Sequence, residues 1–222
     1  MPDKNLSGIC GYVFFAKYMR TKILSKRGLL IAVPTGFVLF QVFIFSFAST
    51  NSMLDISVLP IENDVTFSNQ EQTNVGLPVR LKIPVIKVDS TIIPVGLTPD
   101  GAMDAPKDPA EVAWFNLGAR PGENGTAVID GHYDWINNMS AVFDNLHKLR
   151  KDDKIFVEDE KGAIYTFVVR EIRIYNKDAE ASDVFISNDS SSHLNLITCT
   201  GSWEKTEKTF SERLIIFTDK EN

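Results

Sequence analysis

Cysteine is scarce in this sequence of 222 residues: there are only two, Cys10 and Cys199, near the two ends. Zinc sites and redox-active dithiols need cysteines at short, regular spacings, and the chain has no such pair. The sequence therefore indicates no cysteine-based metal site. Cys199 is also the only cysteine in the last two-thirds of the chain, so any cysteine chemistry in that part depends on one sulfur atom.

Positive charge is scarce after residue 27. Residues 1–27 contain six lysines and arginines against one aspartate, a net charge of +5, whereas the whole chain carries −6. The remaining residues therefore sum to −11. Domains that bind nucleic acid normally present a basic surface to the phosphates, so this acidic body argues against a nucleic-acid partner.

Charge is absent altogether from residues 28–48, a run of 21 residues that is long enough to cross a bilayer as one helix. The basic residues lie before this run. The positive-inside rule therefore predicts a basic cytoplasmic N-terminus at 1–27 and an extracellular position for everything after the run. A cleaved signal peptide is the alternative, but its apolar core is usually only about 7–15 residues long. We therefore expect an uncleaved transmembrane signal anchor and a single-pass protein of the cell membrane.

Residues 49–77 are rich in Ser, Asn, Gln and Thr, a composition typical of an extracytoplasmic linker. From residue 78 to 222 the sequence changes to short β-branched and aromatic runs separated by turn residues, and only 139–149 has helical spacing. We expect an all-β domain here, a closed barrel of about eight strands with one or two short helices, preceded by the transmembrane helix. The runs that predict strands are 79–84, 85–88, 92–95, 126–129, 154–157, 164–169, 171–175, 194–199 and 213–217.

Three residues of this domain have the chemical types that acyl transfer needs. Cys199 ends an apolar run and precedes Thr200-Gly201, so its sulfur is expected at a strand end. His132 similarly follows a strand and a glycine, and Arg213 opens the last strand. Taken singly, each is more typical of a structural or surface residue. Together they describe a nucleophile, a general acid/base and an electrophilic stabiliser.

The motifs around these residues resemble those of sortases, the cysteine transpeptidases of the Gram-positive cell surface. The resemblance rests on Leu196-Ile197-Thr198-Cys199, on Gly131-His132, and on Arg213 at the start of a strand. Residues 118–125 and 141–146 are most similar to class E and class F sortases, with class D as an alternative. The resemblance implies a sortase-type eight-stranded β barrel, no metal or other cofactor, and cleavage of an LPXTG-like sorting signal between Thr and Gly.

The resemblance also implies a role for each candidate. Cys199 would attack the Thr carbonyl and form a thioacyl-enzyme, His132 would protonate the leaving Gly amine, and Arg213 would hold the substrate or the oxyanion. The expected partners are surface proteins with C-terminal LPXTG-like signals and an amine acceptor, either in the wall precursor or on a pilin lysine. Protein anchoring, pilin polymerisation and hydrolysis are not distinguished. Candidate substrate-binding residues beside these are Thr198, Val184, Phe185, Ile186 and Trp203.

Asp130 departs from the family pattern, because similar sortases usually carry a small residue such as alanine directly before Gly-His. A carboxylate at this position would either favour protonated His132 or alter the substrate groove. Asp130 is therefore a further substrate-binding candidate, and the sequence leaves its effect on the reaction open.

Two other functions fit parts of the sequence. The first is a membrane-tethered β-barrel binding protein without enzymatic activity, in which Cys199 is buried and inert. The second is another cysteine acyl-transferase, such as an L,D-transpeptidase, in which the histidine lies close before the cysteine. Here 67 positions separate His132 from Cys199, and Arg213 follows, so a sortase is favoured.

Overall fold

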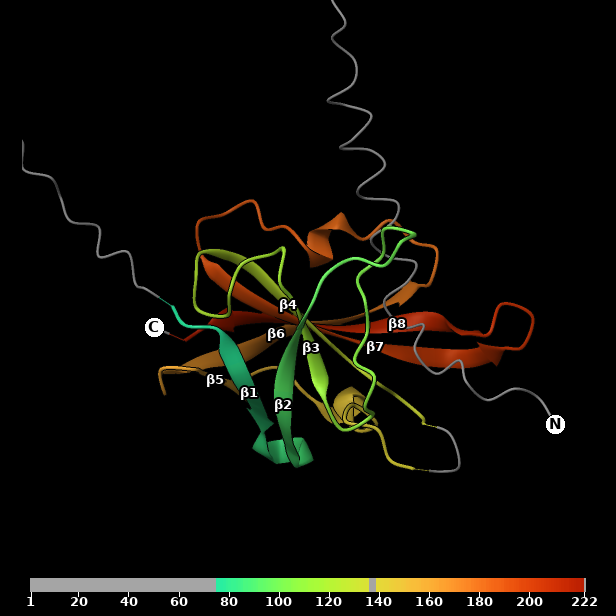
Figure 1. Ribbon diagram of the computed structural model, residues 1–222, viewed down its shortest axis with the longest axis horizontal. Helices are drawn as coiled ribbons and strands as arrows, with labels where there is room; N and C mark the ends of the chain where they lie inside the picture. Colours follow the sequence, from blue (N-terminus) through green and yellow to red (C-terminus); the bar gives the residue numbers. More distant parts are fainter. Residues whose placement is uncertain (1–74, 136–138, 222) are drawn as a thin grey trace, which may run out of the picture. The chain divides into compact units, whose positions relative to one another are not determined.

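The computed structural model describes residues 75–135 and 139–221, and these form a closed barrel of eight strands (Figure 1). Around the barrel the strands follow the order β1-β2-β3-β4-β7-β8-β6-β5. The pairs β2–β3 and β4–β7 are parallel, and the other neighbouring pairs are antiparallel. The predicted eight-stranded all-β barrel is confirmed. The strands are β1 (Pro78–Ile83), β2 (Val88–Val95), β3 (Val112–Phe115), β4 (Gly125–Gly131), β5 (Lys154–Asp159), β6 (Ile164–Asn176), β7 (Ser192–Glu204) and β8 (Thr209–Lys220).

The helical segments of the described residues are single 3-10 turns. They are η1 (Pro84–Ile86), η3 (Leu146–Lys148) and η4 (Ser182–Val184). The predicted cytoplasmic segment 1–27, the predicted anchor 28–48 and most of the predicted linker 49–77 lie outside the described residues. Within the two described ranges, no helix is long and apolar enough to cross a membrane.

The helix predicted at 139–149 is wrong, since turns and the 3-10 helix η3 replace it. Two backbone N–H groups at the start of this stretch bond to partners outside an α-helical ladder. The N–H of Ala141 donates to the Asp144 carboxylate at 2.9 Å, and the N–H of Phe143 donates to the carbonyl of His132 at 3.0 Å. The Phe143 N–H is thereby taken from the bond to the carbonyl of Met139 that a helix over 139–149 would need. The same bond also fastens this stretch to the end of β4.

Three strand predictions differ from the structure. The run 85–88 is largely the 3-10 turn η1, with Pro84 at its start, and its last residue begins β2, which also contains the run 92–95. β3 was not among the predicted runs, because it has only four residues and all four are buried, so it shows no alternation. The runs 164–169 and 171–175 belong to one strand, β6. A register shift between Val169 and Glu171 leaves Arg170 as an extra residue, which interrupts the apolar pattern as a β-bulge does.

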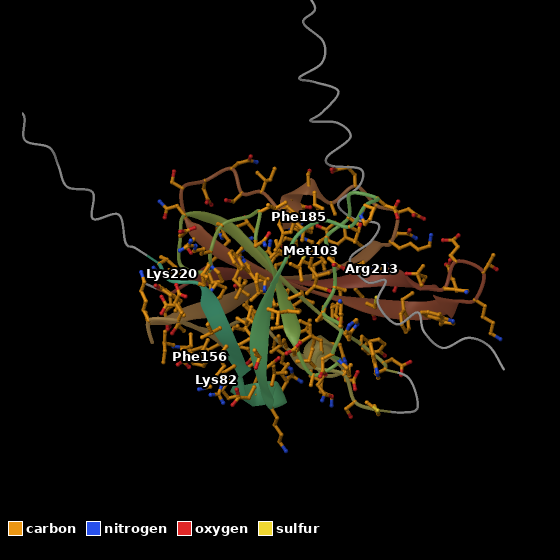
Figure 2. All side chains as sticks on the ribbon, viewed as in Figure 1. Lys82, Met103, Phe156, Phe185, Arg213 and Lys220 are labelled. Atoms are coloured by element: carbon orange, nitrogen blue, oxygen red, sulfur yellow. The ribbon has the colours of Figure 1, made fainter. Side chains whose placement is uncertain are left out.

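Apolar side chains fill both faces of the sheet. One cluster takes alternate residues from all eight strands and therefore lies inside the barrel; Leu81, Ile129 and Leu196 belong to it. The second cluster takes the opposite face of β3, β4, β7 and β8 and adds residues from the connections that cover that face, Met103 and Phe185 among them (Figure 2). The outer face of these strands is therefore a second core, and the candidate residues lie at its edge.

Candidate active site

Cys199 and Arg213 lie directly opposite each other on neighbouring strands. The antiparallel register of β7 and β8 pairs Ile197 with Ile215 and Cys199 with Arg213. Because side chains alternate along a strand, Cys199 and Arg213 share the outer face with these two isoleucines. Cys199 is 6% exposed and Arg213 is fully buried. The thiolate form of Cys199 is the one that can act as a nucleophile.

His132 flanks Cys199 from the other side. β4 and β7 are parallel, and their register pairs Asp130 with Ile197. His132 is two residues beyond Asp130, and Cys199 is two residues beyond Ile197. The register therefore brings His132 alongside Cys199 at the carboxyl end of β4. The three candidates from distant parts of the sequence thus converge on one place, with Cys199 on the middle strand.

The His132 ring is almost fully enclosed. It is 2% exposed, its Nε2 lies 2.6 Å from the carbonyl oxygen of Pro106, and the Trp135 ring is centred 4.6 Å away. A carbonyl oxygen only accepts, so Nε2 carries a proton in this arrangement. Burial lowers the pKa of His132, while the bond to Pro106 and the charge of Asp108 oppose this change. The histidine is therefore fixed in orientation and biased toward its neutral form.

The Arg213 guanidinium is held by the start of its own strand. Nη1 donates to the carbonyl oxygens of Phe210 and Glu212, both at 2.9 Å, and Nη2 donates to Thr209 Oγ1 at 3.0 Å. Burial lowers the pKa of Arg213 to about 10, and the negative charges of Asp130 and Asp178 oppose that decrease. The arginine remains a cation at neutral pH, beside Cys199.

Two glycines beside the candidate residues occupy positions where a larger residue would clash or be strained. A Cβ on Gly131 would lie 2.5 Å from Cδ2 of Phe143, closer than real Cβ contacts come, so only glycine is accommodated directly before His132. Gly201 has a φ of +82° and lies where the β7–β8 register shifts. This left-handed conformation favours glycine. The Gly-His and Cys-Thr-Gly motifs therefore have a steric basis.

Thr198 lies on the face of β7 opposite to Cys199. Its hydroxyl donates to the carbonyl of Gly131 at 2.7 Å, and the residue is 1% exposed. The sequence suggests Thr198 as a groove residue, but the structure directs it into the barrel and occupies its hydroxyl. Its contact instead ties the strand that carries Cys199 to the end of the strand that carries His132.

Asp130, suggested as a substrate-binding residue, is completely buried. Neither of its carboxylate oxygens has a hydrogen-bond partner among the described residues. Burial raises the pKa of Asp130 to about 8, and the positive charge of Arg213 opposes the rise. The Gly131 N–H also favours the ionised form, although its position does not meet hydrogen-bond geometry.

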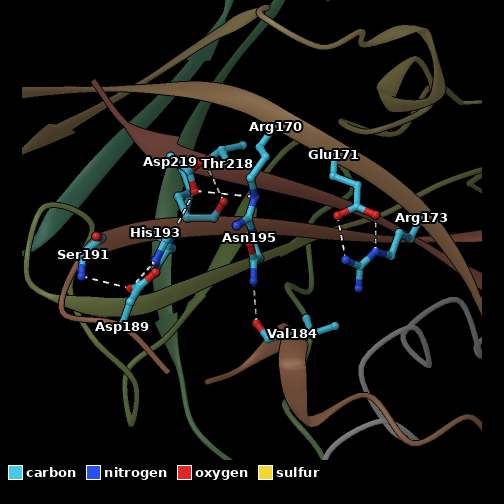
Figure 3. Close-up of polar contacts among 11 residues, drawn as sticks. Arg170, Glu171, Arg173, Val184, Asp189, Ser191, His193, Asn195, Thr218 and Asp219 are labelled. Atoms are coloured by element: carbon cyan, nitrogen blue, oxygen red, sulfur yellow. Dashed lines mark hydrogen bonds and ion pairs between the residues drawn. The ribbon is translucent and has the colours of Figure 1, made fainter. Parts of the chain in front are cut away.

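The loop candidates before β7 differ in their accessibility. Val184 is fully buried, and its carbonyl accepts a 2.7 Å bond from Asn195 Nδ2 (Figure 3). Phe185 is half-buried and packs edge-on against Phe115, with ring centroids 5.9 Å apart. Ile186 is 38% exposed. Of the three, Ile186 presents the most surface to a peptide, whereas Val184 is part of the outer core.

Further contacts hold this loop, and Figure 3 shows those of Arg173 with Glu171 and of His193 with Asp189 and Asp219. Arg173 on β6 binds Asp183 at 2.9 Å and also pairs with Glu171. His193 on β7 lies 2.8 Å from Asp189 and 2.8 Å from Asp219. The loop from β6 to β7 is therefore anchored near its middle and near its end.

Trp203 belongs to an aromatic row that the sequence did not reveal as a unit. Its ring is 5.2 Å from that of Phe210, which is in turn 5.5 Å from that of Tyr133. Phe210 also supplies the carbonyl that binds Arg213, and Tyr133 directly follows His132. Trp203 is 45% exposed. The row thus runs from the candidate site outward to solvent. An aromatic residue directly after the histidine was the signal available in the sequence.

The described residues contain no group of three or more His, Cys, Asp or Glu side chains that is arranged to hold a metal ion. The candidate site combines the Cys199 sulfur, an oriented imidazole and a buried cation on one face of three neighbouring strands.

Comparisons with known proteins agree with this architecture. A family model described as "Sortase domain" matches residues 81–221. Comparison with curated proteins found no match. Among solved structures, sortase C-1 from Actinomyces oris is 23% identical with a TM-score of 0.52, covering 65% of this chain and 71% of that chain. Sortase C1 from Streptococcus agalactiae is 22% identical with a TM-score of 0.51, covering 65% of this chain and 66% of that chain.

The chain is also similar to sortase A from Corynebacterium diphtheriae, with 20% identity and a TM-score of 0.49. That alignment covers 67% of this chain and 62% of the other, so this chain spans less than two-thirds of that protein's length. At these identities the structural likeness establishes the fold, and the family model carries the assignment.

Proposed function

Because this chain belongs to the sortase family of cysteine transpeptidases, we propose that it cleaves an LPXTG-like sorting signal and transfers the acyl part to an amine. The bond cleaved would be the one between Thr and Gly of the signal. The observation that supports this most directly is the cross-strand pairing of Cys199 with Arg213, with His132 at the end of the adjoining parallel strand.

The first half-reaction would form a thioester. Reduced Cys199 attacks the Thr carbonyl as a thiolate, although a free cysteine has a pKa of about 8.5. The neighbouring positive charge of Arg213 favours the thiolate and then the oxyanion of the tetrahedral intermediate. When that intermediate collapses, the C–N bond breaks and protonated His132 gives its proton to the departing Gly amine.

The second half-reaction would reverse the proton transfer. The incoming amine attacks the thioester, His132 takes a proton from it, and the Cys199 thiolate leaves as the new amide bond forms. Because burial lowers the pKa of His132, only part of the enzyme carries the imidazolium at neutral pH. We therefore expect a pH profile with a limb on each side.

Cellular context follows from the N-terminal sequence. Residues 28–48 would anchor the enzyme in the cell membrane and hold the catalytic domain outside. Its substrates would be surface proteins with C-terminal sorting signals, and its acceptor an amine of the wall precursor or a pilin lysine. The motifs at 118–125 and 141–146 favour class E or F over class D.

The test uses the full-length chain in detergent with a reductant. It is incubated with an LPXTG-containing peptide library and an amine, and products are read by mass spectrometry. We expect cleavage after Thr, a Thr–amine product, and a trapped thioacyl-enzyme whose added mass is on Cys199. Cleavage by Cys199→Ala at the wild-type rate would remove Cys199 from the mechanism. Rapid alkylation of Cys199 without any cleavage would favour a different cysteine acyl-transferase. Resistance of Cys199 to alkylation would favour a binding protein without enzymatic activity.

A further inference from the structure

Asp130 is an unusual residue for its position. It lies on β4 between Ala113 of β3 and Ile197 of β7, and it is fully buried. Both carboxylate oxygens are without a hydrogen-bond partner among the described residues. A buried, unpaired carboxylate costs folding free energy, because its ionised form loses hydration without compensation. A carboxyl group in such a place needs an explanation beyond packing.

The side chain of Asp130 faces the candidate active site. Along β4 the outer face is taken by Val128 and Asp130, and along β7 by Ile197 and Cys199. On β8 the same face carries Ile215 and Arg213.

The charged and titratable groups that face Asp130 are therefore few. They are Arg213 from β8, Cys199 from β7 and His132 two residues further along its own chain. Asp178, after β6, acts on the same guanidinium, and β3 contributes only the uncharged Ala113.

Burial and the guanidinium oppose each other at this carboxyl. Burial raises the pKa of Asp130 to about 8, and the charge of Arg213 opposes the rise. In the other direction, Asp130 raises the pKa of Arg213 against the effect of burial. Both forms of the carboxyl are therefore accessible within a unit or so of physiological pH. A buried carboxyl with an ordinary pKa would remain ionised throughout this range.

We propose that Asp130 is a positioning residue that acts through Arg213. In its neutral form it leaves the guanidinium charge available to the thiolate and the oxyanion. In its ionised form it neutralises that charge and repels the Cys199 thiolate, so acyl transfer slows. Switching requires only the loss of one proton from the carboxyl to solvent, and Asp130 makes no bond to substrate. The proposal deepens the sortase function and rests on it.

The kinetic test compares kcat/KM from pH 5.5 to 9.5 for wild type, Asp130→Asn and Asp130→Ala, using the reduced full-length chain. We expect the three rates to agree within about twofold below pH 7. Above pH 8, kcat/KM of wild type should fall about tenfold relative to both variants. A rise of one pH unit increases the ratio of ionised to neutral carboxyl tenfold. Two variants are used so that instability of either one still leaves the test intact. A ratio of rates that stays constant across this range would overturn the proposal.

Asp159→Asn is the matched control. Asp159, at the end of β5, is also a buried carboxyl, but it accepts bonds from the backbone N–H groups of Gly76, Lys161 and Ala163. It faces none of the candidate catalytic residues. We expect its pH profile for kcat/KM to follow wild type. An equal change in the profile of this variant would mean that any buried carboxyl has the effect, and would overturn a role specific to Asp130.

A second measurement is independent of activity. Unfolding of the reduced chain by urea is followed at pH 4, 6, 8 and 9 for wild type and Asp130→Asn. A carboxyl whose pKa is raised on folding makes the folded protein less stable as the pH rises from the unfolded-state pKa of about 4 to the folded-state pKa. Asp130→Asn should therefore gain stability relative to wild type over pH 4–8.

The two measurements separate the possible failures. If Asp130→Asn is instead less stable by a constant amount at pH 6–9, Asp130 is a permanently ionised partner of Arg213 and the proposal is wrong. If the stability difference widens with pH as expected but wild type cleaves no sorting peptide, the proposed sortase function fails. In that case the coupling of Asp130 to Arg213 stands without it.

Discussion

The hydroxyl of Thr198 donates a 2.7 Å hydrogen bond to the carbonyl of Gly131, a residue 67 positions earlier in the chain. One donor atom thereby links the residue before Cys199 to the residue before His132. The bond lies on the face opposite to the candidate site, so it acts on the geometry of the two strands and not on substrate.

Replacing Thr198 by Val removes this bond and keeps the side-chain shape. The Gly131 carbonyl then loses this partner, which should cost about 1–3 kcal/mol of unfolding free energy. We also expect kcat/KM to fall about 10–100-fold, because small misplacements of reacting groups are costly. Urea unfolding and peptide cleavage measure the two effects.

Thr218→Val is the matched control for that experiment. Thr218 is fully buried on β8, and its hydroxyl donates to the Leu194 carbonyl at 2.6 Å, away from Cys199. It should lose a similar amount of stability and retain activity below its unfolding temperature. If both threonine variants lost activity equally, the special role of the Thr198 bond would be refuted.

Arg213→Lys should lower kcat by about 10²–10³-fold, the range observed when an oxyanion stabiliser is removed. One ammonium group cannot reproduce the three bonds that the guanidinium makes to Phe210, Glu212 and Thr209. Arg173→Lys is the control, because Arg173 is 42% exposed and pairs with Glu171 on the surface. Steady-state cleavage assays compare them, and wild-type turnover by Arg213→Lys would remove Arg213 from the mechanism.

Gly131→Ala should destabilise the domain by about 1–3 kcal/mol, as overpacking commonly does. The new Cβ would lie 2.5 Å from the Phe143 ring and would displace the end of β4, so activity should fall as well. Gly96→Ala tests the specificity of this effect. A Cβ at Gly96 has its nearest neighbour 3.9 Å away, so we expect less than about 0.5 kcal/mol of change. Thermal unfolding distinguishes the two, and equal losses would contradict the steric argument.

Asp159→Asn should change the acid stability of the domain. Burial alone would raise the pKa of Asp159, but bonds from the Ala163, Gly76 and Lys161 N–H groups and from Tyr165 outweigh it and hold the pKa below its usual value. Such a carboxylate contributes stability above about pH 4, and the contribution is lost as pH falls through the lowered pKa. Urea unfolding from pH 2.5 to 7 should therefore show a shallower acid decline in the variant. An unchanged acid limb would contradict this.

Local sequence patterns predicted most strands correctly because burial on one face leaves an alternating record, as in β1 and β5. Patterns failed where contacts from elsewhere determined the backbone. At 139–149, the carbonyl of His132 took the Phe143 N–H that a helix needs. At β3, burial on both faces removed the alternation.

The candidate residues Cys199, His132 and Arg213 were identified from their chemical types and motifs, and the structure brings them to one place. No such signal marked the interior position of Thr198. The contacts that buried His193 makes with Asp189 and Asp219 also left none. Both depend on which strands become neighbours in the barrel, and neighbours far apart in sequence leave no local pattern.

The sequence by itself determined the all-β architecture and the residue types that converge. These are properties of local alternation and of single residues. Only the tertiary structure decided that Asp130 is fully buried on the same face as Arg213, because that depends on β4, β7 and β8 lying side by side. The charge balance of the site is therefore a property of strand order and register, which no local pattern encodes.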